Sequence, residues 1–179
     1  MTGMTDAPHA APPQDAWPDL EPLASAQPPA WTEIPHPRPY LLRVAPTARA
    51  SSRSIPHVSN IEYLRWVDRA AELHARHLGL SRETLLGANR MWFVSRHELD
   101  YLAECWPGED LRLATWVRSV GRASSWRDTI VWREADRRVV FRAATLWVLV
   151  DILSRRPVRI GVELARMLLP LANSTRDRV

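Results

Sequence analysis

Residues 57–63 read His-Val-Ser-Asn-Ile-Glu-Tyr and combine a titratable group with polar groups at close spacing. The imidazole of His57 titrates near neutral pH, so it can transfer a proton to or from a reacting group. The amide of Asn60 can orient a carbonyl oxygen or a water molecule. Each residue also has a structural alternative, since a histidine can hydrogen-bond a loop and an asparagine can cap a helix. The segment indicates carbonyl or water chemistry, and these alternatives stay open.

An amphipathic helix is predicted to begin within this segment and to run from Ser59 to Leu78. Ser59 or Asn60 can cap its first amides, and Gly79 suits a left-handed stop. A helix N-terminus offers free backbone amides and the positive end of the dipole, so amides near Ser59 to Ile61 could hold an oxyanion. The apolar residues that define the expected face recur at intervals of three, four or seven: Ile61, Leu64, Val67, Ala71 and Leu78.

Most of the chain after this helix, to about residue 152, is predicted to form strands. Residues 40–44 form an earlier strand candidate, and residues 162–169 a short final helix. One long helix beside antiparallel strands predicts an α+β domain whose sheet must wrap around the helix to bury it. The expected strands, separated by turn signals at 107–108 and 136–137, are 90–101, 111–117, 126–132 and 139–150.

Length and proline content predict one domain with two flexible ends. A chain of 179 residues fits a single core. Ten of the fifteen prolines fall within residues 1–40, where no helical or strand period is present. We therefore predict a disordered Pro-rich tail over 1–38, a folded domain over 39–172 and a flexible C-terminus over 173–179.

Composition excludes several classes of protein. The net charge is +4 and the pI is about 10.1, but the arginines are dispersed and no nucleic-acid motif is present, so no nucleic-acid partner is expected. No stretch approaches the ~18 apolar residues of a membrane span. The lone Cys105 and the absence of a signal pattern predict a cytoplasmic protein.

Residues 57–66 resemble the loop-to-helix signature of the hotdog-fold thioesterases, usually Asp-x-x-Gly-His-Val-Asn-Asn-x-x-Tyr. Residues 92–101, 107–111 and 145–151 resemble later strands of that family, whose members include 4-hydroxybenzoyl-CoA and acyl-carrier-protein thioesterases. The likeness covers roughly residues 39–165. It implies a hotdog fold, an antiparallel sheet wrapped around one long central helix. It also implies hydrolysis of an acyl-CoA or acyl-carrier-protein thioester without a cofactor, by a homodimer or a dimer of dimers (a homotetramer) with active sites between subunits.

The sequence departs from that signature at the residue that would carry the base. Arg53 stands at the position of the usual Asp, and a guanidinium stays protonated, so it cannot act as a base. The expected catalytic residues are then His57, Asn60 and Glu72, the last because it lies near where some related enzymes carry a helix carboxylate. The carboxylates that could replace the Asp, or could simply face water, are Glu72, Glu62, Asp68 and Glu98. The expected substrate-binding residues are Arg53, Ser59, Ile61, Tyr63 and Trp66, and no metal site is expected.

Two other functions remain open at this point. Loss of the Asp favours a non-catalytic hotdog protein that binds an acyl thioester or a partner protein. A hotdog dehydratase or hydratase would also need an acid–base pair near residue 57, which Arg53 does not help to form. His74 and His77 lie three residues apart on the predicted helix, but a helix-borne metal pair usually needs further ligands.

Overall fold

The computed structural model describes residues 20–24, 26–52 and 54–171. Within these ranges the strands form a single antiparallel sheet in the order β1-β2-β4-β5-β6-β3, and β7 pairs with the end of β6. The helices are α1 (Asn60–His77), α2 (Arg82–Gly87) and α3 (Val162–Met167), and 3-10 turns occupy Ala30–Thr32 and Ala48–Ala50. The strands are β1 (Leu20–Pro22), β2 (Tyr40–Val44), β3 (Arg90–Tyr101), β4 (Leu111–Val120), β5 (Ser124–Arg133), β6 (Arg138–Asp151) and β7 (Arg156–Pro157).

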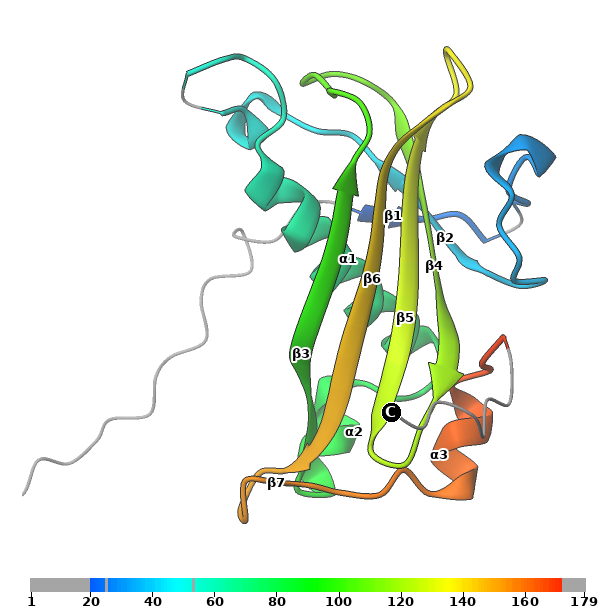
Figure 1. The fold of residues 1–179 in the computed structure, drawn as a ribbon, viewed down its shortest axis with the longest axis vertical. Helices are drawn as coiled ribbons and strands as arrows, with labels where there is room; N and C mark the ends of the chain where they lie inside the picture. The colour runs from blue at the N-terminus through cyan, green and yellow to red at the C-terminus, as the bar shows by residue number, and fades with distance from the viewer. Residues whose placement is uncertain (1–19, 25, 53, 172–179) are drawn as a thin grey trace, which may run out of the picture.

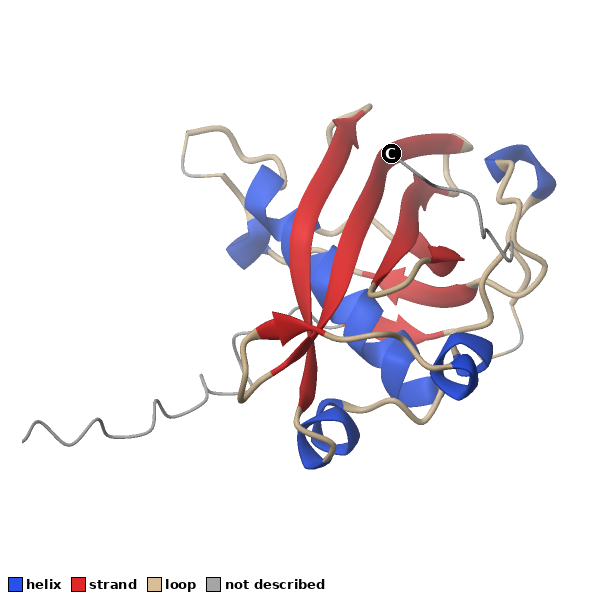
Figure 2. Ribbon diagram, turned by 60° about the horizontal axis from the view of Figure 1, so that its bottom comes forward, coloured by secondary structure: helices blue, strands red, loops and turns tan. Residues whose placement is uncertain are grey.

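The long strands β3 to β6 curve around α1, which lies along the hollow face of the sheet (Figures 1 and 2). This arrangement confirms the predicted α+β hotdog fold. The strand predicted over residues 90–101 has the same bounds in the structure, and Gly79 takes the expected left-handed conformation (φ 77°) just after α1. None of the described helices is long and apolar enough to cross a membrane.

The buried face of α1 matches the predicted one only in part. Val67 is fully buried as expected, but Ile61 is 57% exposed. The aromatic residues Tyr63 and Trp66 face the sheet instead, in contact with Phe141 and other core residues. Because two large rings fill more of the space between helix and sheet than aliphatic side chains do, they determine which side of the helix is buried.

The N-terminal segment covers the outer face of the sheet and corrects the predicted tail. β1 pairs with β2 through Leu20 to Pro22, and Leu20 is buried. Trp31 and Ile34 pack on a buried cluster that includes Trp116. The prediction of disorder over residues 1–38 is therefore wrong for the described residues from 20 onward. The outer face of the sheet is itself apolar, so it must be shielded from water, and a segment without helical or strand periodicity can cover it. Residues 1–19 and 173–179 lie outside the described residues.

Strand β3 forms one edge of the sheet. It pairs with β6 along its length, with a register shift between Val94 and Arg96, and with no other described strand. Most of its residues are exposed, and the apolar Phe93 and Val94 are 43% and 39% exposed. An edge strand presents a row of unpaired backbone N–H and C=O groups, so this edge is a template for pairing with another strand.

We expect Trp66→Ala to lower the free energy of unfolding by about 3–5 kcal/mol, because Trp66 is 2% exposed and its removal leaves a cavity between α1 and the sheet. Ile61→Ala, on the same helix, is the matched control and should change stability by less than about 0.5 kcal/mol. Urea denaturation followed by circular dichroism measures both. Equal losses for the two variants would contradict the orientation of α1.

Candidate functional site

The loop before α1 and the first turn of the helix line a cavity of about 300 Å³, called here the junction pocket. The structure brings the predicted His57, Asn60 and Tyr63 together at this pocket. The end of β3 and the loop after it form the opposite wall. The complete lining is His57, Val58, Asn60, Tyr63, Tyr101, Leu102, Ala103 and Glu104.

The N-terminus of α1 leaves a backbone amide for a ligand. Ser59 is the N-cap, as predicted, and its Oγ accepts a bond from the Ile61 amide at 3.4 Å. The Ser59 carbonyl accepts a bond from the Glu62 amide at 2.9 Å. The Asn60 amide has no acceptor among the described residues, while its carbonyl accepts a bond from the Tyr101 hydroxyl at 3.2 Å. The Asn60 N–H can therefore donate to an oxygen at the positive end of the helix dipole.

Hydrogen bonds hold the backbone of His57, whose N–H donates to the Ile55 carbonyl and whose carbonyl accepts from the Ser52 N–H, each at 2.8 Å, while its ring is held by packing. Its Nδ1 is buried and has no partner in the part of the chain that the structure describes. The ring lies edge-on to Trp106, with 6.4 Å between centroids. Glu104, which the sequence did not single out, lines the same pocket. Glu104 lies in a loop outside any motif, so only the fold reveals its place beside His57.

The predicted substrate-binding residues do not all line the junction pocket. Tyr63 and Trp66 are 3% and 2% exposed, with their ring centroids 4.7 Å apart, and they form the base of the pocket and the core behind it. Burial raises the pKa of Tyr63 well above its usual value, so its hydroxyl stays protonated. Ile61 points toward solvent, and Arg53 lies outside the described residues.

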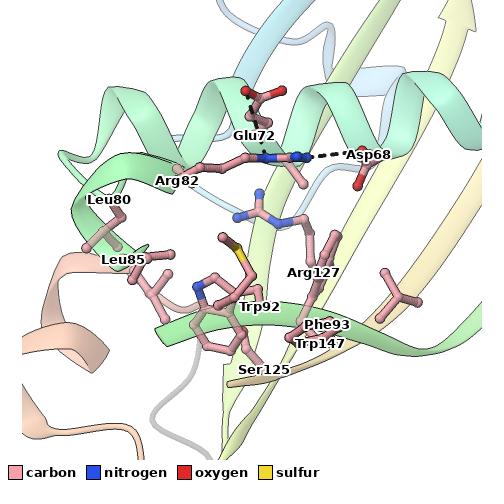
Figure 3. A pocket seen from close by; sticks show the side chains of 15 residues that line it. Asp68, Glu72, Leu80, Arg82, Leu85, Trp92, Phe93, Ser125, Arg127 and Trp147 are labelled. Atoms are coloured by element: carbon pink, nitrogen blue, oxygen red, sulfur yellow. Dashed lines mark hydrogen bonds and ion pairs between the residues drawn. The ribbon is translucent and has the colours of Figure 1, made fainter. Parts of the chain in front are cut away.

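A second cavity, of about 360 Å³, lies between the helices and the sheet (Figure 3). It is bounded by the middle of α1, by α2, by the first residues of β3 and β5 and by the second half of β6. We call it the helix-face pocket. Its walls are mostly apolar, with carboxylates on the α1 side and an arginine from β5. The lining comprises Asp68, Ala71, Glu72, Ala75, Leu80, Arg82, Leu85, Met91, Trp92, Phe93, Val94, Ser125, Arg127, Trp147 and Leu168.

The two carboxylates of the helix-face pocket differ in environment. Glu72, the helix carboxylate expected to be catalytic, pairs with Arg69 at 2.9 Å and Arg76 at 3.2 Å, and Arg82 lies 4.0 Å away. Asp68 pairs with Arg82 alone, at 3.5 Å. Burial raises the pKa of Asp68 above its ordinary value, although Arg82 opposes the shift. Burial thus favours the protonated form of Asp68, whereas Glu72 is paired with cations on several sides.

A single chain does not bring these carboxylates to the junction pocket. Asp68 follows Asn60 by eight residues and Glu72 follows it by twelve, which corresponds to about 12 Å and 18 Å along the axis of α1. A carbonyl held at the Asn60 amide is thus beyond hydrogen-bond reach of either carboxylate of the same chain. The sequence prediction grouped Glu72 with His57 and Asn60, and one chain alone does not group them.

A buried arginine–histidine pair lies behind the helix-face pocket. The Arg127 Nη1 lies 2.8 Å from the Nδ1 of His74 and donates to the Thr115 hydroxyl at 3.3 Å. Burial, reinforced by Arg127, lowers the pKa of His74 to about 2, so His74 is neutral and accepts this bond. His74 also stacks on Tyr40, with ring centroids 5.1 Å apart. No cluster of three or more metal-ligating side chains occurs among the described residues.

Comparisons with known proteins connect this fold to one family. A sequence model of the thioesterase-like superfamily matches residues 55–168. A Lactobacillus plantarum protein assigned as an oleoyl thioesterase has a similar structure, with a TM-score of 0.72 and 18% identity over 79% of this chain. This chain spans only 54% of the length of that protein.

Two further structures are similar over most of their own lengths. The 1,4-dihydroxy-2-naphthoyl-CoA thioesterase of Synechocystis has a TM-score of 0.67 and 12% identity, over 74% of this chain and 96% of its own. A Staphylococcus aureus protein in complex with CoA has a TM-score of 0.68 and 11% identity, over 74% and 82%. No curated protein matches the sequence of this chain.

The buried His74 should make stability depend on pH. Its folded pKa of about 2 lies below the ordinary value of 6.5, so the unfolded chain binds the extra proton as pH falls below 6.5. We expect His74 to remove up to about 1.4 kcal/mol of stability per pH unit below that point. Urea denaturation between pH 7 and pH 4.5 measures this slope. His74→Gln, which keeps an acceptor for Arg127, should be less pH-dependent, and an unchanged slope would contradict the assignment.

Proposed function

We propose that this chain, which belongs to the thioesterase-like superfamily, hydrolyses the thioester of an acyl-CoA, or of an acyl group on a carrier protein, to a free carboxylic acid. The observation that carries the proposal is the N-terminus of α1 at the junction pocket, where Asn60, whose amide has no acceptor among the described residues, lines the same cavity as His57. A donor at a helix N-terminus stabilises negative charge that develops on a carbonyl oxygen.

The proposed reaction proceeds in two steps. Water attacks the thioester carbon, a base takes one proton from it, and the carbonyl oxygen becomes an oxyanion that accepts a bond from the Asn60 amide. The carbon–sulfur bond then breaks as the oxyanion collapses. The thiolate leaves and takes up a proton, so the products are one carboxylic acid and one thiol. His57 positions the water in this proposal, and a carboxylate accepts its proton.

The sheet edge supports a homodimer as the working form. The Tyr101 end of β3 contacts the start of α1, and the Met91–Val94 end lines the helix-face pocket. In an isologous dimer two copies of β3 would run antiparallel, so the end of each strand would meet the beginning of the other. The junction pocket of one subunit would then lie beside the helix-face pocket of the other.

This dimer would complete the active site with a carboxylate from the second chain. Asp68 is our candidate for the base, because burial raises its pKa toward the working range of a general base. Glu72 lines the same pocket and is the competing candidate expected from the family resemblance. Arg69 and Arg76 engage the carboxylate of Glu72 in two ion pairs, whereas Asp68 pairs with Arg82.

The thiol half of the substrate is proposed from chemistry and similarity together. The phosphates of CoA, or the acidic surface of a carrier protein, would suit a chain with a net charge of +4. The similar Staphylococcus aureus structure is a complex with CoA. Arg53, at the signature position of the usual Asp, is proposed as an anion contact. The competing function is a non-catalytic thioester-binding protein, which the loss of that Asp favours.

Hydrolysis of a panel of short, long and aromatic acyl-CoAs, followed by release of free thiol, tests the activity. We expect turnover by the purified protein and a loss of about 10²–10⁴-fold in kcat for Asp68→Asn, since a positioned proton-transfer group contributes that much. His57→Gln, which removes the group that positions the water, should also lower kcat, and Glu72→Gln should lower it less than Asp68→Asn. The reverse order would make Glu72 the base. Binding of acyl-CoA without turnover by the wild type would support the non-catalytic protein.

Mixing two inactive variants tests the composite site. His57→Gln and Asp68→Asn damage opposite halves, so a mixed dimer has one intact site and one doubly damaged site. After subunit exchange we expect about a quarter of the wild-type activity, because half of the dimers are mixed and each has half of the sites. Sedimentation equilibrium should give twice the 20.5 kDa chain mass. No recovery of activity in an exchanged mixture would place both groups in one chain.

A further inference from the structure

The guanidinium of Arg127 is a buried cation without a carboxylate partner. Arg127 is 5% exposed, and none of the ion pairs among the described residues includes it. Its two hydrogen-bonding contacts both use Nη1 and end on neutral groups, the imidazole of His74 and the hydroxyl of Thr115. Burial lowers its pKa to about 10, so the group stays charged at neutral pH.

This arrangement is costly if its only purpose is to hold the fold together. Taking a charge out of water costs several kcal/mol unless an opposite charge and hydrogen bonds compensate. An apolar side chain of similar length would fill the same space without that cost. The sheet keeps the charge instead, at the wall of a cavity (Figure 3).

The carboxylates of the helix-face pocket do not compensate Arg127. Asp68 pairs with Arg82, and Glu72 pairs with Arg69 and Arg76. These ion pairs use the acidic groups on the α1 side, and Arg127 extends toward the cavity from the sheet side. The anion that suits Arg127 would therefore come from a bound molecule.

The other lining residues of the cavity indicate the chemical nature of the rest of that molecule. Met91, Trp92 and Trp147 line it beside Arg127, together with the aliphatic residues of α1 and α2. The other charged side chains of the lining, Asp68, Glu72 and Arg82, lie in ion pairs with one another or with neighbouring arginines. Apolar walls beside Arg127 therefore suit a molecule that has a hydrocarbon body and an anionic end. A plain alkyl chain would bury the guanidinium further without giving it a partner, so the cavity disfavours one.

We propose that the helix-face pocket takes an acyl group whose far end carries a carboxylate, and that Arg127 is the residue that selects it. The proposal rests on the proposed thioesterase function, since it identifies the acyl class of that substrate. Arg127 is a specificity residue here, because it binds the end of the acyl group away from the thioester.

Direct binding tests the pocket without requiring catalysis. Isothermal titration calorimetry of the full chain should show the monomethyl ester of adipate, which has one free carboxylate, binding about 10–100-fold more tightly than the neutral dimethyl ester, because a charge-assisted pair in a buried site contributes that much. Arg127→Met should abolish this preference while leaving the melting temperature unchanged or raised. Arg118→Met is the matched control, since Arg118 pairs with Asp128 and does not line this pocket.

Hydrolysis distinguishes failure of this proposal from failure of the enzyme. We expect a higher kcat/KM for adipoyl-CoA than for hexanoyl-CoA in the wild type, and the opposite order in Arg127→Met. Turnover with equal rates for both substrates, or a preference that survives the substitution, would overturn the role of Arg127. If the adipate monomethyl ester binds in a way that depends on Arg127 but no acyl-CoA is hydrolysed, only the proposed thioesterase activity would be overturned. Arg127→Gln serves both comparisons if the Met variant does not fold.

Discussion

Burial of one face of α1 inside the curl of the sheet is the constraint on which the rest of this structure depends. Val67 and Ala70 are fully buried, and Trp66 is nearly so. A helix with that much apolar surface needs cover on more than one side, and long, twisted antiparallel strands can curve to provide it. The curl leaves β3 as an open edge and places α1 beside it. The path of the helix therefore determines both where the amides of its N-terminus open and which residues lie behind the edge strand.

Because α1 is rigid, it keeps the oxyanion-binding amide and the carboxylate of a hydrolytic site apart within one chain. An amide donor and a carboxylate on one α-helix keep a spacing fixed by 1.5 Å of rise per residue, so the Asn60 amide and Asp68 cannot converge within a chain. Two-fold pairing of the edge strands removes this limit, since it places the start of one helix opposite the middle of another. The same edge that would be an aggregation hazard in a monomer becomes the element that completes the site.

Much of the fold, and part of the site, could be predicted from the sequence. Alternation and turn residues identify strands such as 90–101, because these signals act over a few neighbouring residues. The buried face of α1 was not predictable in the same way, since Tyr63 and Trp66 can lie at a surface or in a core, and only the space under the sheet decides. The N-terminal segment that covers the outer face of the sheet, within residues 20–38, shows no helical or strand periodicity. It forms because the outer face of the sheet is apolar, which is a property of distant residues.

The candidate site shows the same division between local and distant information. In the loop-to-helix segment His57 and Asn60 lie three positions apart, so a short motif can identify them. Arg127 and His74 are 53 positions apart and meet only because β5 faces α1 across the interior. Nothing local marks an arginine in a strand as buried, and the default for that residue is solvent. A charge that the fold buries against this default, beside a cavity and without an ion pair among the described residues, is better explained by a ligand than by stability.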